Sequence, residues 1–205
     1  MRKLLLKMSL SVDGFVGGPE GEIDWLFRSS DAASTAWLVG KLWEAGLHIM
    51  GSGTFRGMKA FYPRSAEPYA APMNDIPKAY FSRGGRNDTL SNRSLEDAKH
   101  WNPRRTSGPP AGDWEQAPIL TGDLTKEIKK LKAQEGKPIL AHGGASFARS
   151  LIATRLIDEF ILLTHPVVLG RGLTIFSELS APLDVVLVEA QHFPLGVTAS
   201  VYRAS

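Results

Sequence analysis

The chain has 205 residues, with 24 Lys and Arg against 21 Asp and Glu, five His and no Cys. Hydrophobic residues make up 43% of it, which is typical of a globular protein and excludes a disordered one. The absence of Cys excludes disulfides, Cys-based zinc sites, iron–sulfur clusters and a thiol nucleophile. One domain over residues 1–205 is expected, because a chain of this length buries a core without such staples.

Neither a membrane nor a nucleic acid is indicated as a partner. The longest apolar runs, such as residues 160–163, are far shorter than the roughly 20 residues of a membrane helix. Lys7 interrupts the N-terminal leucine run, so no signal peptide is predicted and a cytoplasmic protein is expected. The net charge of +3 comes mostly from residues 81–107, which predicts a solvated basic face or a site for a small phosphorylated ligand.

In the N-terminal half, strands and helices are predicted to alternate. Apolar and polar residues alternate over residues 3–11, which predicts a half-buried strand. A helix whose apolar residues share one face follows, with Ser30, Asp31 or Ser34 as its N-cap. Further strands are predicted at residues 47–50 and 77–82, and residues 84–117 are predicted to be mostly loop.

The C-terminal half continues the alternation and ends in two successive strands. Strands are predicted at residues 118–120, 138–141 and 158–168, with a helix after each of the first two, and an antiparallel pair at 183–193 and 196–203. Gly136 is expected to end the first of these helices. This order predicts an α/β fold with a mixed sheet covered by helices, in which ligands bind beyond the carboxyl ends of the strands.

The most informative segment is a predicted strand followed by two glycines and a helix start. Gly143 and Gly144 would let the backbone approach a bulky anion, and the amides of Ala145, Ser146 and Phe147 would point at it. A diphosphate would fit there. The alternative is that the glycines only make a tight turn between the strand and the helix.

A second glycine-bearing turn follows the predicted strand at residues 47–50. Its spacing through Gly51, Gly53 and Gly57 is one residue off the dinucleotide fingerprint, and no acidic ribose contact is evident, so a Rossmann fold is excluded. Thr54 either holds a phosphate or ribose oxygen or caps the next helix.

Hydrolase and metal chemistry are weaker alternatives. Ser146 lies in a segment that differs by one residue from the nucleophile elbow of hydrolases, with His165 or His192 and Asp184 as nominal partners in a triad. The chain is short for a hydrolase fold of that kind. No pair of histidines is spaced at i and i+4, which disfavours a metal site. The five histidines are His48, His100, His142, His165 and His192.

Several segments together resemble the dihydrofolate reductase-like superfamily, in particular stand-alone relatives of the C-terminal reductase domain of the bifunctional riboflavin-pathway deaminase-reductase. They are MSLSVDGFVGG (8–18), HIMGSGTF (48–55), IPKAYFSR (76–83), ILAHGGASFARSLIATRLIDEFILLTHPVVLGRGLTIF (139–176) and the final strand pair. The resemblance covers nearly the whole chain. It implies a mixed, mostly parallel sheet of about eight strands with helices on both faces and an antiparallel C-terminal strand pair. It also implies NADPH as the hydride donor and a homodimer.

The resemblance also implies which residues bind the cofactor. By position, Gly51, Ser52, Gly53 and Thr54 correspond to a turn that grips the cofactor phosphates, Ser82 and Arg83 to the strand end near the adenosine 2′-phosphate, and Gly143, Gly144, Ala145, Ser146 and Phe147 to the loop under the diphosphate. A guanidinium suits a phosphomonoester, because it donates two parallel hydrogen bonds. Dihydrofolate reductases carry an arginine where Ser52 stands and a pterin-binding carboxylate that has no clean match here, which disfavours folate as the substrate.

These features predict an NADPH-dependent reductase that transfers a hydride to a C=N or C=O bond of a small heterocyclic or ribosylaminopyrimidine-like substrate. The reduced bond must then gain a proton. Asp13 is the first candidate for touching the substrate, with Asp24 and Asp31 behind it, and the alternative for Asp13 is a turn residue before Gly14. Residues 84–107 are predicted to form a lid or else a surface loop. A non-catalytic nucleotide-binding protein on the same fold is the alternative function, and dihydrofolate reductase activity proper is less favoured.

Overall fold

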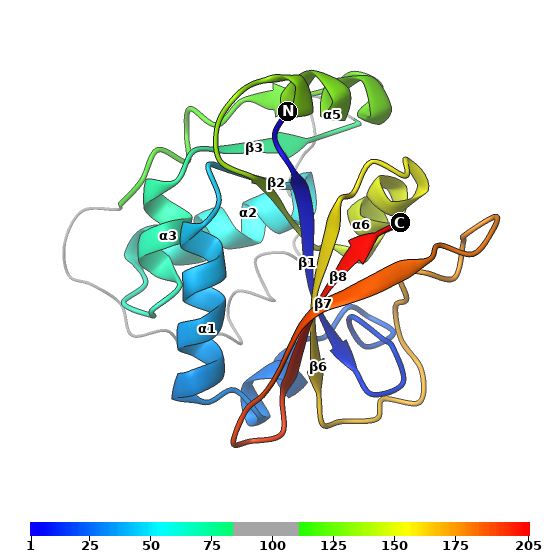
Figure 1. Cartoon of the computed structure of the whole chain (residues 1–205). Helices are drawn as coiled ribbons and strands as arrows, with labels where there is room; N and C mark the ends of the chain where they lie inside the picture. The colour runs from blue at the N-terminus through cyan, green and yellow to red at the C-terminus, as the bar shows by residue number, and fades with distance from the viewer. Residues whose placement is uncertain (84–110) are drawn as a thin grey trace.

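Eight strands form one sheet in the part of the chain that the computed structural model describes, residues 1–83 and 111–205 (Figure 1). Their order is β4-β3-β2-β5-β1-β6-β8-β7. Neighbours from β4 to β6 are parallel, whereas β8 is antiparallel to β6 and β7, which confirms the predicted mixed sheet. The strands are β1 (Leu4–Ser11), β2 (Leu47–Gly51), β3 (Lys78–Phe81), β4 (Ile119–Leu120), β5 (Ile139–His142), β6 (Glu159–His165), β7 (Val185–His192) and β8 (Thr198–Ala204).

Helices cover both faces of the sheet. The α-helices are α1 (Ala32–Trp43), α2 (Ser52–Phe61), α3 (Ala70–Asp75), α5 (Leu124–Ala133) and α6 (Ala145–Ala153), and two 3-10 helices span Asp24–Arg28 and Tyr62–Arg64. Figure 1 shows α1, α2 and α3 on one side of the sheet and α6 on the other. The core is accordingly divided in two, with α1 to α3 packed on one face and α5 and α6 on the other.

The central strand β1 is buried on both faces, so the prediction of a half-buried strand is wrong. Leu4 and Leu6 pack in the core under α5 and α6, whereas Leu5 packs in the core under α1 to α3. The alternation in the sequence is real, but both faces of a central parallel strand are covered by helices. Lys7 therefore points into the interior on the α1 side, because it shares the face of Leu5.

Two predicted element ends also shift. The helix expected to stop at Gly136 ends at Ala133, and Gly136 lies beyond it in the connection to β5 with a φ of 132°. The strand predicted over residues 158–168 is β6, which covers Glu159–His165.

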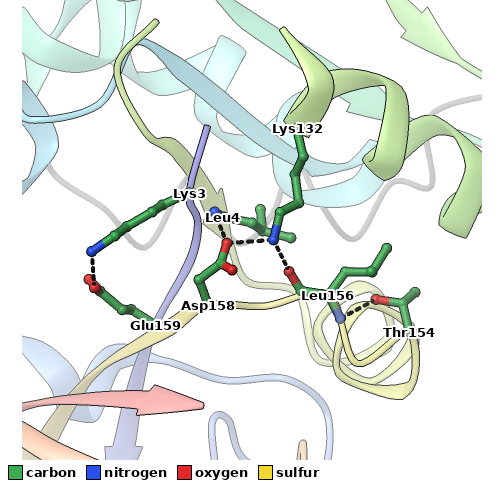
Figure 2. Close-up of polar contacts among 7 residues, drawn as sticks. All are labelled: Lys3, Leu4, Lys132, Thr154, Leu156, Asp158 and Glu159. Carbon is green, nitrogen blue, oxygen red and sulfur yellow. Dashed lines mark hydrogen bonds and ion pairs between the residues drawn. The ribbon is translucent and has the colours of Figure 1, made fainter. Parts of the chain in front are cut away.

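Polar contacts at the amino-terminal edge of the sheet tie β1, β6 and α5 together (Figure 2). The Asp158 carboxylate accepts hydrogen bonds from the Leu4 amide at 2.6 Å and from Lys132 Nζ at 2.5 Å. Lys132 Nζ also donates to the Leu156 carbonyl at 2.7 Å, and Lys3 pairs with Glu159 at 2.7 Å. Charged side chains thus cover the amino-terminal edge of the sheet. The glycine turns lie at the opposite, carboxyl-terminal edge.

The edge strand β7 is exposed along nearly its whole length. Val185, Val186, Leu187 and Val188 are each between 42% and 54% exposed. No helix among the described residues is long and apolar enough to span a membrane. The predicted lid, residues 84–107, lies outside the described residues.

Candidate functional site

Two glycine-capped helix starts meet at the carboxyl edge of the sheet. Strands β2 and β5 are parallel neighbours, and each leads directly into a helix, β2 into α2 and β5 into α6. The N-cap residues are Gly51 and Gly144, and neither provides a side-chain cap. The first turns of both helices therefore present backbone N–H groups without intrahelical partners, next to the positive ends of two helix dipoles. Such an arrangement binds anions.

The two turns interlock in a way that requires glycine. Gly144 has a φ of 108°, and a Cβ there would lie 2.8 Å from Thr54 Oγ1. A Cβ on Gly143 would lie 2.6 Å from the Met8 sulfur, and one on Gly51 would lie 3.0 Å from the Phe147 Cβ. Thr54 Oγ1 donates a hydrogen bond to the Gly143 carbonyl and so joins α2 to the turn before α6. The close approach of the two turns fixes the shape of the site.

A cavity of about 690 Å³ opens over these turns. All of the residues predicted from the sequence to bind the cofactor line it except Gly143. The remaining lining residues were not predicted: Phe81, Leu120, Thr121, Gly122, Leu124, Arg149, Ser150 and Leu173. The structure thus gathers the predicted residues at one place, and their binding roles stay predictions.

The chemistry of the cavity suits a phosphorylated dinucleotide. Among the described residues, its lining holds the two arginines Arg83 and Arg149 and no carboxylate. Phe81 and Phe147 stack with their ring centroids 5.4 Å apart and give it an aromatic wall. Its volume lies in the range of ordinary ligand sites. The residues present therefore fit the cofactor that the resemblance implies.

Asp13, the first candidate for substrate contact, does not line the cavity. Its Oδ1 accepts hydrogen bonds from Ser11 Oγ at 2.6 Å and from the Leu169 amide at 3.1 Å, and its Oδ2 accepts one from the Gly170 amide at 2.7 Å. These bonds, led by that from Ser11, lower the pKa of Asp13. Asp13 therefore links the turn after β1 to the loop after β6.

The other two candidate aspartates also lie away from the cavity. Asp31 is the N-cap of α1, as one of the sequence alternatives predicted: its Oδ1 accepts from the Ser34 amide at 2.7 Å, and its Oδ2 accepts from the Leu195 amide at 3.0 Å. The bond from Ser34 is the main reason that the pKa of Asp31 is lowered. Asp24 is exposed and pairs with Arg28 at 3.2 Å.

The structure does not assemble the hydrolase alternative. Ser146 lines the cavity, but none of the described histidines does. His165 Nδ1 lies 2.9 Å from Ser29 Oγ, and His192 Nδ1 lies 3.1 Å from Thr198 Oγ1. None of the histidines in residues 1–83 and 111–205 is therefore positioned to activate Ser146.

Sequence reasoning missed a polar row on the inner face of the sheet under α1. Lys7 lies directly across from His142 in the pairing of β1 with β5, and its Nζ donates to Ser9 Oγ at 3.3 Å. Burial lowers the pKa of Lys7 to about 8. No carboxylate within the described residues lies in ion-pair range of it. The sequence carried no local signal for this, because Lys7 stands at a polar position of the alternating pattern of β1 and only the packing of α1 to α3 covers that face.

Three histidines of this region are held neutral by burial. His48 Nδ1 and His142 Nε2 lie 2.5 Å apart, and the two rings stack. Burial lowers the pKa of His48 to about 3, that of His165 to about 4 and that of His142 well below its usual value. The ammonium of Lys7 lowers the pKa values of His142 and His165 further. Lys78, which lies across from His48 and is buried, lowers the pKa of His48 in the same way, so the row holds two lysines, Lys7 and Lys78.

Fold and site together define a dihydrofolate reductase-like domain with a dinucleotide-sized anion site. The family model of the RibD C-terminal domain matches residues 2–199, and the chain belongs to this family. Reductase domains of the family use NADPH. Among curated proteins, the chain is 27% identical over 202 residues to the protein YyaP of Bacillus subtilis (strain 168), covering 98% of this chain and 95% of that one.

Solved structures share the fold. A putative riboflavin biosynthesis protein from Shewanella sp. PV-4 matches with a TM-score of 0.71 and 20% identity, covering 99% of both chains. A diaminohydroxyphosphoribosylaminopyrimidine deaminase/5-amino-6-(5-phosphoribosylamino)uracil reductase from Thermotoga maritima matches with a TM-score of 0.68 and 16% identity, covering the whole of this chain and 57% of that one. A pyrimidine reductase-like protein from Corynebacterium diphtheriae matches with a TM-score of 0.64 and 15% identity, covering 100% of this chain and 92% of that one.

Proposed function

We propose that the protein is an NADPH-dependent reductase that transfers a hydride to a C=N or C=O bond of a small heterocyclic, ribosylaminopyrimidine-like substrate. The observation that carries this proposal is the cavity itself, whose described lining combines two glycine-capped helix starts with two arginines and includes no carboxylate. Such a site suits a dinucleotide with an additional phosphate. Membership of the RibD C-terminal domain family supports the same reading. The proposal includes a cytoplasmic homodimer, as the resemblance implies.

The chain's own residues orient the reactants. When bound, the cofactor supplies the hydride. The turns at residues 51–54 and 143–147 would hold the diphosphate on the amides of α2 and α6, and Ser82 with Arg83 would hold the 2′-phosphate. This grip fixes the reactive ring relative to the substrate, which accounts for much of the rate enhancement in reactions of this kind.

Neither Lys7 nor Asp13 lines the cavity, and of the two Lys7 is the better source of the proton for the reduced bond. The Asp13 carboxylate already accepts three hydrogen bonds and has a lowered pKa, so it is a poor proton donor near neutral pH. Lys7 has an ammonium with a pKa of about 8 and no anionic partner in the part of the chain that the structure describes. It lies across from His142, the residue directly before Gly143, and its Nζ leans toward the carboxyl edge where Ser9 lies.

Cofactor binding and turnover test the proposal separately. Quenching of Trp fluorescence by NADPH and NADH measures binding. Loss of the reduced nicotinamide absorbance measures turnover with 5-amino-6-(5-phosphoribosylamino)uracil, dihydrofolate and a panel of small carbonyl compounds. We expect micromolar binding of NADPH and oxidation of the cofactor with the aminouracil.

The outcomes distinguish the two classes of function. Tight binding without oxidation by any compound of the panel would favour the non-catalytic nucleotide-binding protein. Absence of binding by both cofactors at millimolar concentration would overturn the reductase assignment altogether.

A further inference from the structure

Two buried histidines on neighbouring strands share one hydrogen bond on the α1 side of the sheet. His48 shares the face of Met50 on β2, and His142 shares the face of Leu140 on β5. His48 Nδ1 lies 2.5 Å from His142 Nε2, and the two ring planes are inclined by 22°. The exposed fraction is 0% for His48 and 5% for His142. Each ring is therefore held in place by the other.

Each of the two rings carries a single proton, because burial keeps both of them neutral. Burial lowers the pKa of His48 to about 3 and that of His142 well below its usual value. A neutral imidazole has one N–H donor and one acceptor nitrogen. Of the two nitrogens that face each other, one must therefore donate and the other accept. This choice also decides whether the second nitrogen of each ring carries a proton.

The second nitrogen of His48 decides the direction of the bond. His48 Nε2 is buried and has no hydrogen-bond partner within residues 1–83 and 111–205, and a proton there would be a buried donor without an acceptor. Strand β3 lies on the other side of β2 from β5, and its Lys78 lies across from His48. The positive charge of Lys78 acts on His48 in addition to burial and favours a lone pair over an N–H at Nε2. His48 Nδ1 is thus the donor and His142 Nε2 the acceptor, which leaves the proton of His142 on Nδ1.

This N–H of His142 lies at the place where the proposed reactants must meet. His142 directly precedes Gly143 and lies across from Lys7 in the pairing of β1 with β5. The proposed cofactor turns lie at the carboxyl edge of the sheet, and Lys7, the proposed source of the proton, lies on its α1 side. A substrate that reaches both must lie on the α1 side of this edge, beside His142. In the part of the chain that the structure describes, no group accepts a hydrogen bond from His142 Nδ1.

We propose that His48 is a positioning residue that holds His142 in its Nδ1–H tautomer, and that His142 donates this N–H to a carbonyl oxygen of the substrate. The inference rests on the proposed function, and it narrows the substrate to a heterocycle with a carbonyl group on the ring. The pair is not a proton relay. His48 Nε2, at its far end, has no described partner to which a proton could pass.

Proton–nitrogen NMR of protein with isotope-labelled histidine tests the tautomers without any turnover. The spectra distinguish protonated from unprotonated ring nitrogens, and His142→Gln identifies the signals of His142 by their loss. We expect His48 and His142 both to be protonated at Nδ1 in the protein without ligands. A His142 protonated at Nε2 would overturn the inference, whatever the activity of the protein.

Two variants of His48 test the consequence for the substrate. His48→Leu removes the donor, so His142 should lose its fixed tautomer. The KM for the aminouracil should rise about threefold to tenfold, the cost of one hydrogen bond, with a smaller change in kcat. The affinity for NADPH should stay unchanged, because neither histidine lines the cavity. His48→Asn, whose amide can donate from near the position of Nδ1, should keep both the tautomer and the KM.

Ser29→Ala is the matched control. His165, at the end of β6, is also buried, and its Nδ1 lies 2.9 Å from Ser29 Oγ. The change therefore removes the polar partner of a buried histidine and leaves the pair of His48 and His142 intact. We expect unchanged signals of His142 and an unchanged KM. If Ser29→Ala raised the KM as His48→Leu does, loss of any buried polar contact would suffice, and the positioning role of His48 would be overturned.

Addition of ligands to the labelled protein tests the contact with the substrate. The Nδ1–H signal of His142 should shift when the aminouracil is added to the complex with NADP⁺. The full shift with NADP⁺ alone would place the cofactor against His142 and overturn the substrate contact. If the protein bound NADPH but reduced no compound of the panel, the proposed function would fail and the substrate contact with it. A wrong tautomer would overturn the present inference alone.

Discussion

The burial of one residue, Lys7, lowers the stability of the folded protein. Its side chain is partly buried on the α1 side of the sheet, and no carboxylate among the described residues offsets the lost hydration. An enclosed charge without a partner destabilises the folded state. Such groups with shifted pKa values concentrate at functional sites.

Replacement of Lys7 by Met should therefore stabilise the protein near neutral pH. The pKa of Lys7 falls from 10.5 to about 8, so the folded state disfavours the ammonium by up to about 3 kcal/mol. Between pH 8 and 10.5 the unfolded chain still holds this proton while the folded protein has released it, so the free energy of unfolding rises with pH. Urea unfolding at pH 7 should show Lys7→Met more stable than the unmodified protein, and the difference should vanish above about pH 10.5.

The same variant tests the role of Lys7 as proton donor. Turnover should fall at least about tenfold while the NADPH affinity stays unchanged, because Lys7 lies outside the predicted phosphate turns. Lys3→Met is the control, since Lys3 is an exposed lysine of the same segment, paired with Glu159. If Lys7→Met kept full turnover, Lys7 would not be the proton donor, and Asp13 would again be the first candidate.

At the residue scale, the sequence located the anion-binding part of the candidate site and missed the interior one. Glycines between a strand and a helix carry a local signal, and Gly51 and Gly144 are N-caps in the same cavity. For the candidate aspartates, the sequence showed only their residue type and, for Asp13, its place before Gly14. Neither property distinguishes an aspartate that links two loops by hydrogen bonds from one that contacts the substrate. Lys7 was overlooked because its face of β1 was taken as solvent-exposed, and only the packing of α1 to α3 makes it interior.

At the scale of elements, α1 depends on one carboxylate that was also a candidate for catalysis. Asp31 and Ser34 form a capping box, and the second oxygen of Asp31 accepts from the Leu195 amide in the turn between β7 and β8. The N-terminus of α1 is thus fixed to the C-terminal hairpin.

Asp31→Ala should lower the free energy of unfolding by about 1–2 kcal/mol, the usual cost of losing a cap, whereas Asp31→Asn should lower it less, because its one acceptor oxygen keeps the N-cap bond from Ser34 and loses only the bond from Leu195. Thermal or urea unfolding of both variants measures this difference. Turnover of Asp31→Asn should equal that of the unmodified protein if Asp31 acts only as a cap. A large fall in its turnover with intact stability would make Asp31 a substrate contact after all.

Most elements could be predicted because each carries its own local signal. The helix α1 has its cap and apolar face, and the strand β8 has apolar residues at alternate positions, so sequence and structure agree there. The burial of β1 on both faces could not be predicted, because it depends on which helices the crossovers place over it. The pairing of β2 with β5, which brings the glycine turns together, is likewise a property of topology and has no local signature.

At the scale of the whole molecule, the sheet carries neutral histidines across its centre. His48, His142 and His165 come from β2, β5 and β6, and each is at most 5% exposed. The homodimer stays a prediction, and the exposed apolar residues of β7 are a surface on which a second copy could pack.

These histidines should make the protein sensitive to mild acid. Their pKa values lie far below the 6.5 of an exposed histidine, about 3 for His48 and about 4 for His165. As the pH falls below 6.5, these histidines bind protons in the unfolded chain but not in the folded protein. The free energy of unfolding therefore falls by up to about 1.4 kcal/mol per pH unit for each histidine. Three together would remove up to about 4 kcal/mol per pH unit, which over the pH range above the carboxylates is comparable with the lower part of a typical stability of about 5–15 kcal/mol.

Urea unfolding between about pH 5 and 6.5 measures this slope, and each of His48→Gln, His142→Gln and His165→Gln should reduce it by about a third, whatever it does to the stability at pH 7. His192→Gln is the matched control, because His192 is exposed on β7 and should leave the slope unchanged. Asp13, Asp31 and Glu189 have lowered pKa values, and their contribution is lost only at pH values below the ordinary carboxylate range. If the free energy of unfolding did not change down to about pH 5, the three buried histidines would accept protons without unfolding of the protein. They would then be sites that become charged in the folded state.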